Sequence, residues 1–161
     1  MNMSKTNYLN LIEWNLYQLN CIKNAGSVDL QIKMHCEAVD FIASQKWCVK
    51  INDVYVGSVF PGILAIFLIK IEPINDDVDE QVWVVVGDLP SAYITYEGDT
   101  RTPLEALLVY IDVMGDWVDA VRNGDDLNSV IPVDVEPTLE NAESLESRLE
   151  FLKKVIVPEM Q

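Results

Sequence analysis

The densest group of side chains able to do chemistry is an acidic segment near the middle of the chain. Five of the nine residues from Glu72 to Glu80 are acids, and they include Asp76, Asp77 and Asp79. Carboxylate oxygens are the ligands that Ca²⁺ and Mg²⁺ prefer. The segment lacks, however, the alternating acids, central Gly and terminal Glu of an EF-hand loop. We therefore interpret it as a solvated loop, and we expect no metal and no cofactor.

Carboxylates near tyrosines offer a second kind of chemistry. Asp88 follows a strand-like run, and Glu97 and Asp99 stand beside Tyr96. Two carboxylates held in one cleft can do general acid–base work on a glycoside or another hydrolysable bond. One alternative is therefore a small carboxylate-based hydrolase, or a small-molecule-binding domain, centred on Asp88 and Glu97. Tyr93 or Tyr96 would assist.

Nucleophilic catalysis is not indicated. The only histidine, His35, is next to Cys36 in a predicted helix, where neighbouring side chains point about 100° apart and form no ready pair. The chain has no Gly-x-Ser-x-Gly elbow, phosphate-binding glycine loop or dinucleotide fingerprint. Cys21, Cys36 and Cys48 are odd in number and widely spaced, which favours reduced, buried thiols. We expect no intrinsic catalysis.

A predicted helix over residues 103–122 carries a stripe of a single charge sign. Glu105, Asp112, Asp116 and Asp119 fall within about 60° of one another at 100° per residue. Like charges four residues apart repel by a few tenths of a kcal/mol. A helix that needed only solubility could mix acids with lysines. The stripe therefore favours a surface made for a cationic partner, and with the acidic segment it forms our predicted binding face.

Periodicity predicts the elements that must position these side chains. Residues 4–24 have the apolar spacing of an amphipathic helix, and a second helix follows to about residue 45. Residues 47–60 are then two β-rich runs around Asn52-Asp53, which predicts a hairpin. Residues 63–71 and 82–86 are almost continuously apolar, so both of their faces are expected to be covered.

The same strands predict where the acidic segment lies. We expect 63–71 and 82–86 to be neighbours joined by residues 73–80, with a further strand in 91–96. Thr102-Pro103-Leu104-Glu105 begins a helix, with a capping Thr and a first-turn Pro. A last helix starts at Thr138 and stops near Pro158.

This order of elements predicts an α+β fold in one domain, residues 1–161. It consists of two N-terminal helices, a central and mostly antiparallel sheet of about five strands, and two C-terminal helices.

Charge is distributed very unevenly along the 161 residues. The formal net charge is −15. Residues 1–71 carry six Lys and five acids, whereas residues 72–161 carry five Lys/Arg and 21 acids. Such a field repels nucleic acid and anionic membranes and attracts basic partners. No signal peptide is indicated, and the longest apolar run, residues 59–71, is short of the roughly 20 residues that span a bilayer. We expect a cytoplasmic protein.

Three stretches carry a resemblance. "VWVVVGDLPSAYI", "TPLEAL" and "GDWVDAVRNG" resemble a small group of uncharacterised bacterial proteins, over roughly residues 47–157. The resemblance implies a bacterial cytosolic domain. It brings no activity and no site residues with it.

Together these patterns predict a non-catalytic, acidic protein-binding module. In its sharpest form it is an immunity or inhibitor protein that neutralises a basic toxin or nuclease, because acidic faces of such inhibitors cover basic active sites and associate quickly. A third alternative is a structural subunit of a homo-oligomer. In that case Trp14, Tyr17 and Trp117 would form an exposed patch and a symmetric interface.

Overall fold

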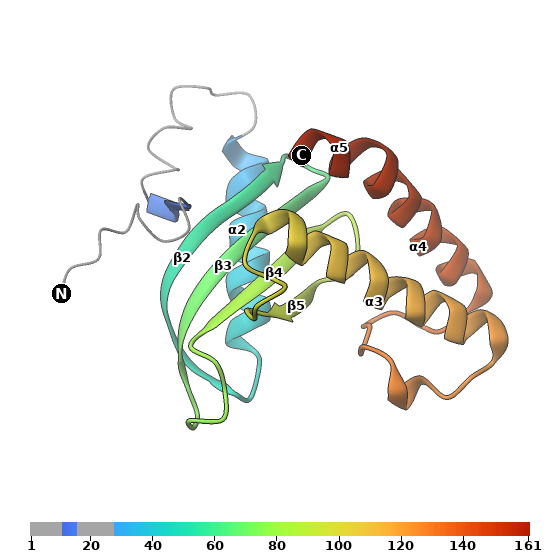
Figure 1. Ribbon diagram of the computed structural model, residues 1–161, viewed down its shortest axis with the longest axis horizontal. Coiled ribbons are helices and arrows are strands. Elements are labelled where there is room, and N and C mark those ends of the chain that lie inside the picture. The colour runs from blue at the N-terminus through green and yellow to red at the C-terminus, as the bar shows by residue number, and fades with distance from the viewer. Residues whose placement is uncertain (1–10, 16–27) are drawn as a thin grey trace. The chain divides into compact units, whose positions relative to one another are not determined.

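The computed structural model describes residues 11–15 and 28–161. The chain divides into two compact units, Met1–Pro103 and Leu104–Gln161. The first contains a sheet and a helix, and the second is helical (Figure 1). The predicted α+β class is therefore confirmed. The prediction of a single domain stays a prediction.

The first unit is built on a five-stranded sheet in which neighbouring strands are antiparallel. The strands follow the order of the chain: β1 (Ile12–Glu13), β2 (Cys48–Phe60), β3 (Leu64–Pro73), β4 (Gln81–Gly87) and β5 (Ala92–Thr95). The short connections that join β2 to β3, β3 to β4 and β4 to β5 favour antiparallel pairing. The predicted pairing of β3 with β4 across an acidic connection is confirmed, and so is the strand within residues 91–96.

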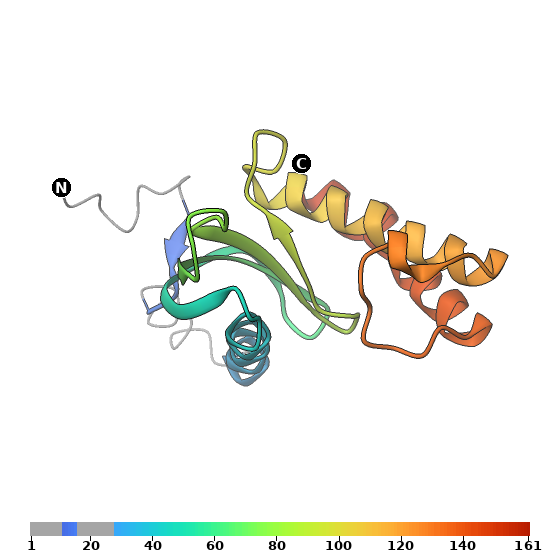
Figure 2. The ribbon, with the colours of Figure 1, turned by 90° about the horizontal axis from the view of Figure 1, so that it is seen from below.

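Two predictions about the start of the sheet are wrong. Asn52 is not in a hairpin turn, because β2 continues through it as one strand of 13 residues, with a register shift between Ile51 and Asp53. A β-bulge accommodates one extra residue and bends the strand, and β2 is visibly curved (Figures 1 and 2). Ile12 and Glu13 form a strand against β2 rather than part of a helix. Apart from residues 11–15, the predicted helix 4–24 lies outside the described residues.

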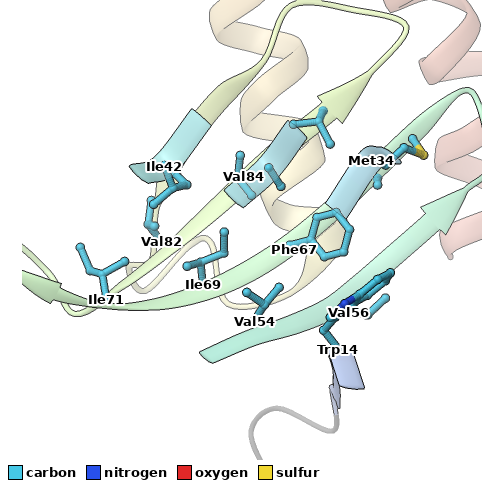
Figure 3. Close-up of a cluster of buried hydrophobic side chains, with 13 residues drawn as sticks. Trp14, Met34, Ile42, Val54, Val56, Phe67, Ile69, Ile71, Val82 and Val84 are labelled. Carbon is cyan, nitrogen blue, oxygen red and sulfur yellow. The ribbon is translucent and has the colours of Figure 1, made fainter. Parts of the chain in front are cut away.

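Helix α2 (Val28–Ala43) covers one face of the sheet (Figure 2). It presents Met34, Ala38 and Ile42 to the sheet at intervals of four residues, which is the spacing of one helix face. These side chains pack on alternate residues of the strands (Figure 3). The strand residues in this cluster are Val54, Val56, Ala65, Phe67, Ile69, Ile71, Val82, Val84 and Val86. Successive residues from Leu64 to Ile69 are all buried, so side chains on both faces of β3 are covered, as the continuous apolarity predicts.

The second unit contains α3 (Pro103–Asn123), a 3₁₀ turn η2 (Leu127–Ser129), α4 (Leu139–Phe151), a π-helical turn η3 (Leu152–Ile156) and α5 (Val157–Met160). Helix α3 begins at the predicted Pro103 and ends before Gly124, whose φ of 68° suits a helix C-terminus. Thr138 caps α4 as predicted, since its Oγ1 accepts the N–H of Asn141 at 3.1 Å.

The last helix ends at Met160, close to the predicted stop near Pro158. The chain continues past the proline because the wider turn η3 precedes it. In that turn the N–H of Val157 bonds to the carbonyl of Leu152, five residues back. Proline has no N–H to donate and its ring clashes with a regular preceding turn, so a π turn accommodates it. No helix among the described residues combines the length and the apolarity needed to cross a bilayer.

Candidate functional site

The loop over residues 74–80 has a defined backbone. The side chain of Asn75 accepts the N–H of Asp77 at 2.9 Å, and the Asn75 carbonyl accepts the N–H of Val78 at 3.3 Å. The base of the loop is closed by the N–H of Ile71, which donates to the carbonyl of Glu80 at 2.8 Å. Asn commonly closes such turns through its side-chain oxygen. Val78 then packs against the core cluster, while its acidic neighbours Asp77 and Asp79 stay exposed to solvent.

The acids of this loop are exposed and carry uncompensated charge. Asp76, Asp77, Asp79 and Glu80 all lie on the surface. Within residues 11–15 and 28–161, no Lys, Arg or His forms an ion pair with any of them. Water solvates such carboxylates well, so they cost the fold little. Their summed field remains available to a cation outside the chain.

Beside this loop the first unit has a hollow of about 190 Å³. Three segments that are far apart in sequence line it, and its residues are Trp47, Asp77, Val78, Asp79, Gln81, Val82, Tyr93 and Thr95. We call it the Trp47 hollow. Trp47 is held against the loop because its carbonyl accepts the N–H of Ile74 at 3.0 Å. Thr95 is the register partner of Val82, so β5 forms a wall beside the loop.

Two aromatic rings meet at this hollow. The ring centroids of Trp47 and Tyr93 lie 5.0 Å apart with 67° between the planes, which is an edge-to-face contact. Tyr93 is 40% exposed, whereas Trp47 is half-buried against the core cluster. The hollow therefore combines aromatic and aliphatic walls with two carboxylates, Asp77 and Asp79. Aromatic faces attract cations, and nearby carboxylates strengthen that attraction.

A second hollow of about 240 Å³ contains Asp88. Its lining residues are Leu30, Lys33, Met34, Glu37, Gly62, Gly87 and Asp88. Glu97 lines neither hollow. With Asp99 it stands exposed in the turn after β5. The two carboxylates that the hydrolase alternative requires in one cleft are therefore not brought together at either hollow.

The predicted stripe on α3 belongs to the second unit. Asp112, Asp116 and Asp119 are exposed, and Glu105 is half-buried. Arg122 is a cation near the C-terminal end of this stripe. Its pKa is raised mainly by its hydrogen bonds to Glu146 and, to a smaller extent, by the negative charge of Asp119.

Arg122 and Glu146 join α3 to α4 in a bidentate ion pair, whose Nη2–Oε1 distance is 2.7 Å. The same hydrogen bonds lower the pKa of Glu146. The predicted binding residues are thus divided between the units: the loop acids belong to the first and the stripe to the second.

Several other sequence-based candidates have structural roles. The ring of His35 stacks on Trp14 with centroids 4.1 Å apart, and burial lowers the pKa of His35. Trp14 and Trp117 are only 7% and 3% exposed, so the predicted exposed aromatic patch is wrong for both. Trp14 is buried in its stack with His35, and Trp117 is a buried residue of α3. Tyr17 lies outside the described residues.

The expectation of buried thiols is also wrong in part. Cys36 is exposed and Cys48 is half-buried, where burial raises the pKa of its thiol. Cys21 lies outside the described residues. In the part of the chain that the structure describes, no group of three or more His, Cys, Asp or Glu side chains is arranged to hold a metal ion.

The sequence pattern does not predict the Trp47 hollow. From the pattern, Tyr93 is expected only to assist a hydrolase, and Trp47 is expected to begin a strand. One signal was available: in "SAYITY" the residues alternate, which predicts that Tyr93 and Thr95 share one face of the strand.

Comparison with known proteins adds no relative, because no family model, curated protein or solved structure matches the chain. The resemblance to a bacterial group stays an expectation.

Proposed function

We propose that the protein is a non-catalytic binding module for a basic protein, and that the loop over residues 74–80 is its main contact. One observation carries this proposal: Asp76, Asp77, Asp79 and Glu80 are all exposed on an ordered loop, and no described residue forms an ion pair with them. A loop held by its own hydrogen bonds loses little conformational entropy on binding.

Its charge suits fast association with a cationic surface. With a formal net charge of −15 the chain accelerates encounter with a positive partner and repels nucleic acid. The stripe of Asp112, Asp116 and Asp119 adds to this field from the second unit. In its sharpest form, the proposal is a cytoplasmic immunity or inhibitor protein that occupies the basic site of a toxin or nuclease.

Affinity capture with matched variants tests the proposal. The tagged protein is exposed to native lysate at low and at high salt, and retained proteins are identified by mass spectrometry. The same capture is run with Asp77→Asn/Asp79→Asn and, as a control of equal charge, with Asp134→Asn/Glu136→Gln. The control residues are exposed in the connection before α4.

The expected result is one basic protein that is retained at low salt and depleted at high salt. Exposed charge pairs contribute about 0.2–1 kcal/mol each. Loss of two pairs should therefore weaken binding about two- to thirtyfold in the loop variant, with less change in the control. A partner that both variants retain equally would refute the loop as the contact.

A further inference from the structure

We propose that the Trp47 hollow is a binding site for a single arginine side chain of the basic partner. This inference rests on the proposed function, since it names what the loop recognises. The basis is the hollow rather than the acids alone: Trp47, Tyr93 and Val82 form its apolar walls, and Asp77 and Asp79 add charge.

Size restricts the occupant. Pockets for drug-sized ligands and cofactors are about 300–1,000 Å³. The Trp47 hollow, at about 190 Å³, is smaller than that range. One long side chain entering from a partner's surface matches it better than a free metabolite. Because the sheet register pairs Val82 with Thr95 and Val84 with Tyr93, the part of the wall on β4 and β5 is formed before the partner arrives.

Chemistry restricts the occupant further. The edge-to-face pair of Trp47 and Tyr93 offers aromatic surface against which a planar cation can stack. Asp77 and Asp79 both line the hollow and supply carboxylate oxygens that can accept hydrogen bonds from a donor with several N–H groups. Guanidinium has this combination of planarity and several donors, whereas the lysine ammonium is a compact point charge. The methylene stem of arginine would lie along the apolar wall at Val82.

Titration with N-acetyl-arginine amide, followed by NMR of the indole N–H signals, tests this directly. The chain has four tryptophans, and Trp14, Trp83 and Trp117 are 7%, 0% and 3% exposed and do not line the hollow. Their signals serve as internal references. Replacing Trp47 by Phe assigns its signal. N-acetyl-citrulline amide is the matched control, because it retains the shape of arginine without the charge.

The expected result is a saturable shift of the Trp47 signal by the arginine amide and none by the citrulline amide. Tyr93→Leu keeps apolar bulk on β5 and should weaken arginine binding about two- to fivefold, as expected for an exposed cation–π contact. Asp77→Asn/Asp79→Asn should weaken it at least as much, and Asp134→Asn/Glu136→Gln should leave it unchanged.

Three results would overturn the inference: no shift of Trp47, equal shifts with citrulline, or stronger binding of N-acetyl-lysine amide. These outcomes are separate from failure of the proposed function. If Asp77→Asn/Asp79→Asn loses the captured basic protein while the arginine amide leaves Trp47 unmoved, the loop is the contact and the hollow is not. If the arginine amide binds at Trp47 but capture is insensitive to the loop, the hollow binds arginine and the proposed function fails.

Discussion

Thr100 closes the turn that ends β5, and its removal should destabilise the first unit measurably. The residue is only 5% exposed. Its hydroxyl donates to the carbonyl of Thr95 at 2.5 Å and accepts the N–H of Glu97 at 2.8 Å. Its own carbonyl accepts the indole N–H of the fully buried Trp83. Thr100→Val keeps the shape of the side chain and can make neither hydroxyl bond.

The magnitude follows from those two bonds. A hydrogen bond contributes about 1 kcal/mol net, and a buried partner that is left unsatisfied costs more. Thr100→Val should therefore lower the free energy of unfolding by about 2–3 kcal/mol. Thr100→Ser keeps both bonds and loses one methyl group, which costs about 0.8 kcal/mol. Serine should thus be the milder change although it alters the volume more.

Urea unfolding followed at the Trp83 indole N–H signal measures both variants. A local probe is used because a chain of two compact units need not unfold in a single transition. The midpoint should fall with an unchanged slope, which marks a change of stability rather than of the denatured state. If Thr100→Val were no more destabilising than Thr100→Ser, the two hydroxyl bonds would not be what closes the turn.

Three further predictions concern single positions. Gly87 has a φ of 143°, and a Cβ at this position would lie 2.3 Å from the carbonyl oxygen of Ile63. Gly87→Ala should therefore lower the free energy of unfolding, measured in urea, by about 2–4 kcal/mol. A loss below about 1 kcal/mol would contradict the strained geometry. In α3 a methyl group on Gly115 meets no atom within 4 Å, so Gly115→Ala should instead stabilise the second unit by about 1 kcal/mol in a thermal melt, and a loss of stability would count against that open space. Burial lowers the pKa of His35 below 6.5, so the unfolded chain binds the proton more tightly and stability should fall as pH drops through 6.5. His35→Phe can still stack on Trp14 and should flatten the pH profile between 7.5 and 5.5, and an unchanged profile would exclude His35 as its source.

Local signals made much of the fold predictable. The apolar runs of β3 and β4, the Thr102-Pro103 start of α3 and the capping Thr138 of α4 are each visible within a few neighbouring residues. The predicted turn at Asn52 is wrong because a bulge and a turn select similar residues, and only the pairing of β2 with β3 distinguishes them. The predicted helix is wrong at Ile12 and Glu13 because a two-residue strand has no periodicity of its own. Such a strand forms only through its pairing with β2.

The candidate site was half predictable for the same reason. Composition alone identifies the acidic loop, since exposure of neighbouring acids hardly depends on the rest of the fold. The Trp47 hollow requires the α2–β2 connection, the β3–β4 loop and β5 to meet. That meeting follows from the register of Thr95 on Val82 and from the hydrogen bond between Ile74 and Trp47. Neither contact has a signal within a short stretch of sequence.

The most direct test of the central claim is the salt dependence of binding to the captured basic partner. Dissociation constants are measured across a range of ionic strengths for the wild type, for Asp77→Asn/Asp79→Asn and for Asp134→Asn/Glu136→Gln. Salt screens exposed charges, with a Debye length of about 10 Å at 0.1 M. We predict that the loop variant binds more weakly and with a flatter salt dependence, while the control parallels the wild type. Parallel lines for all three proteins would contradict a binding contact at the acidic loop.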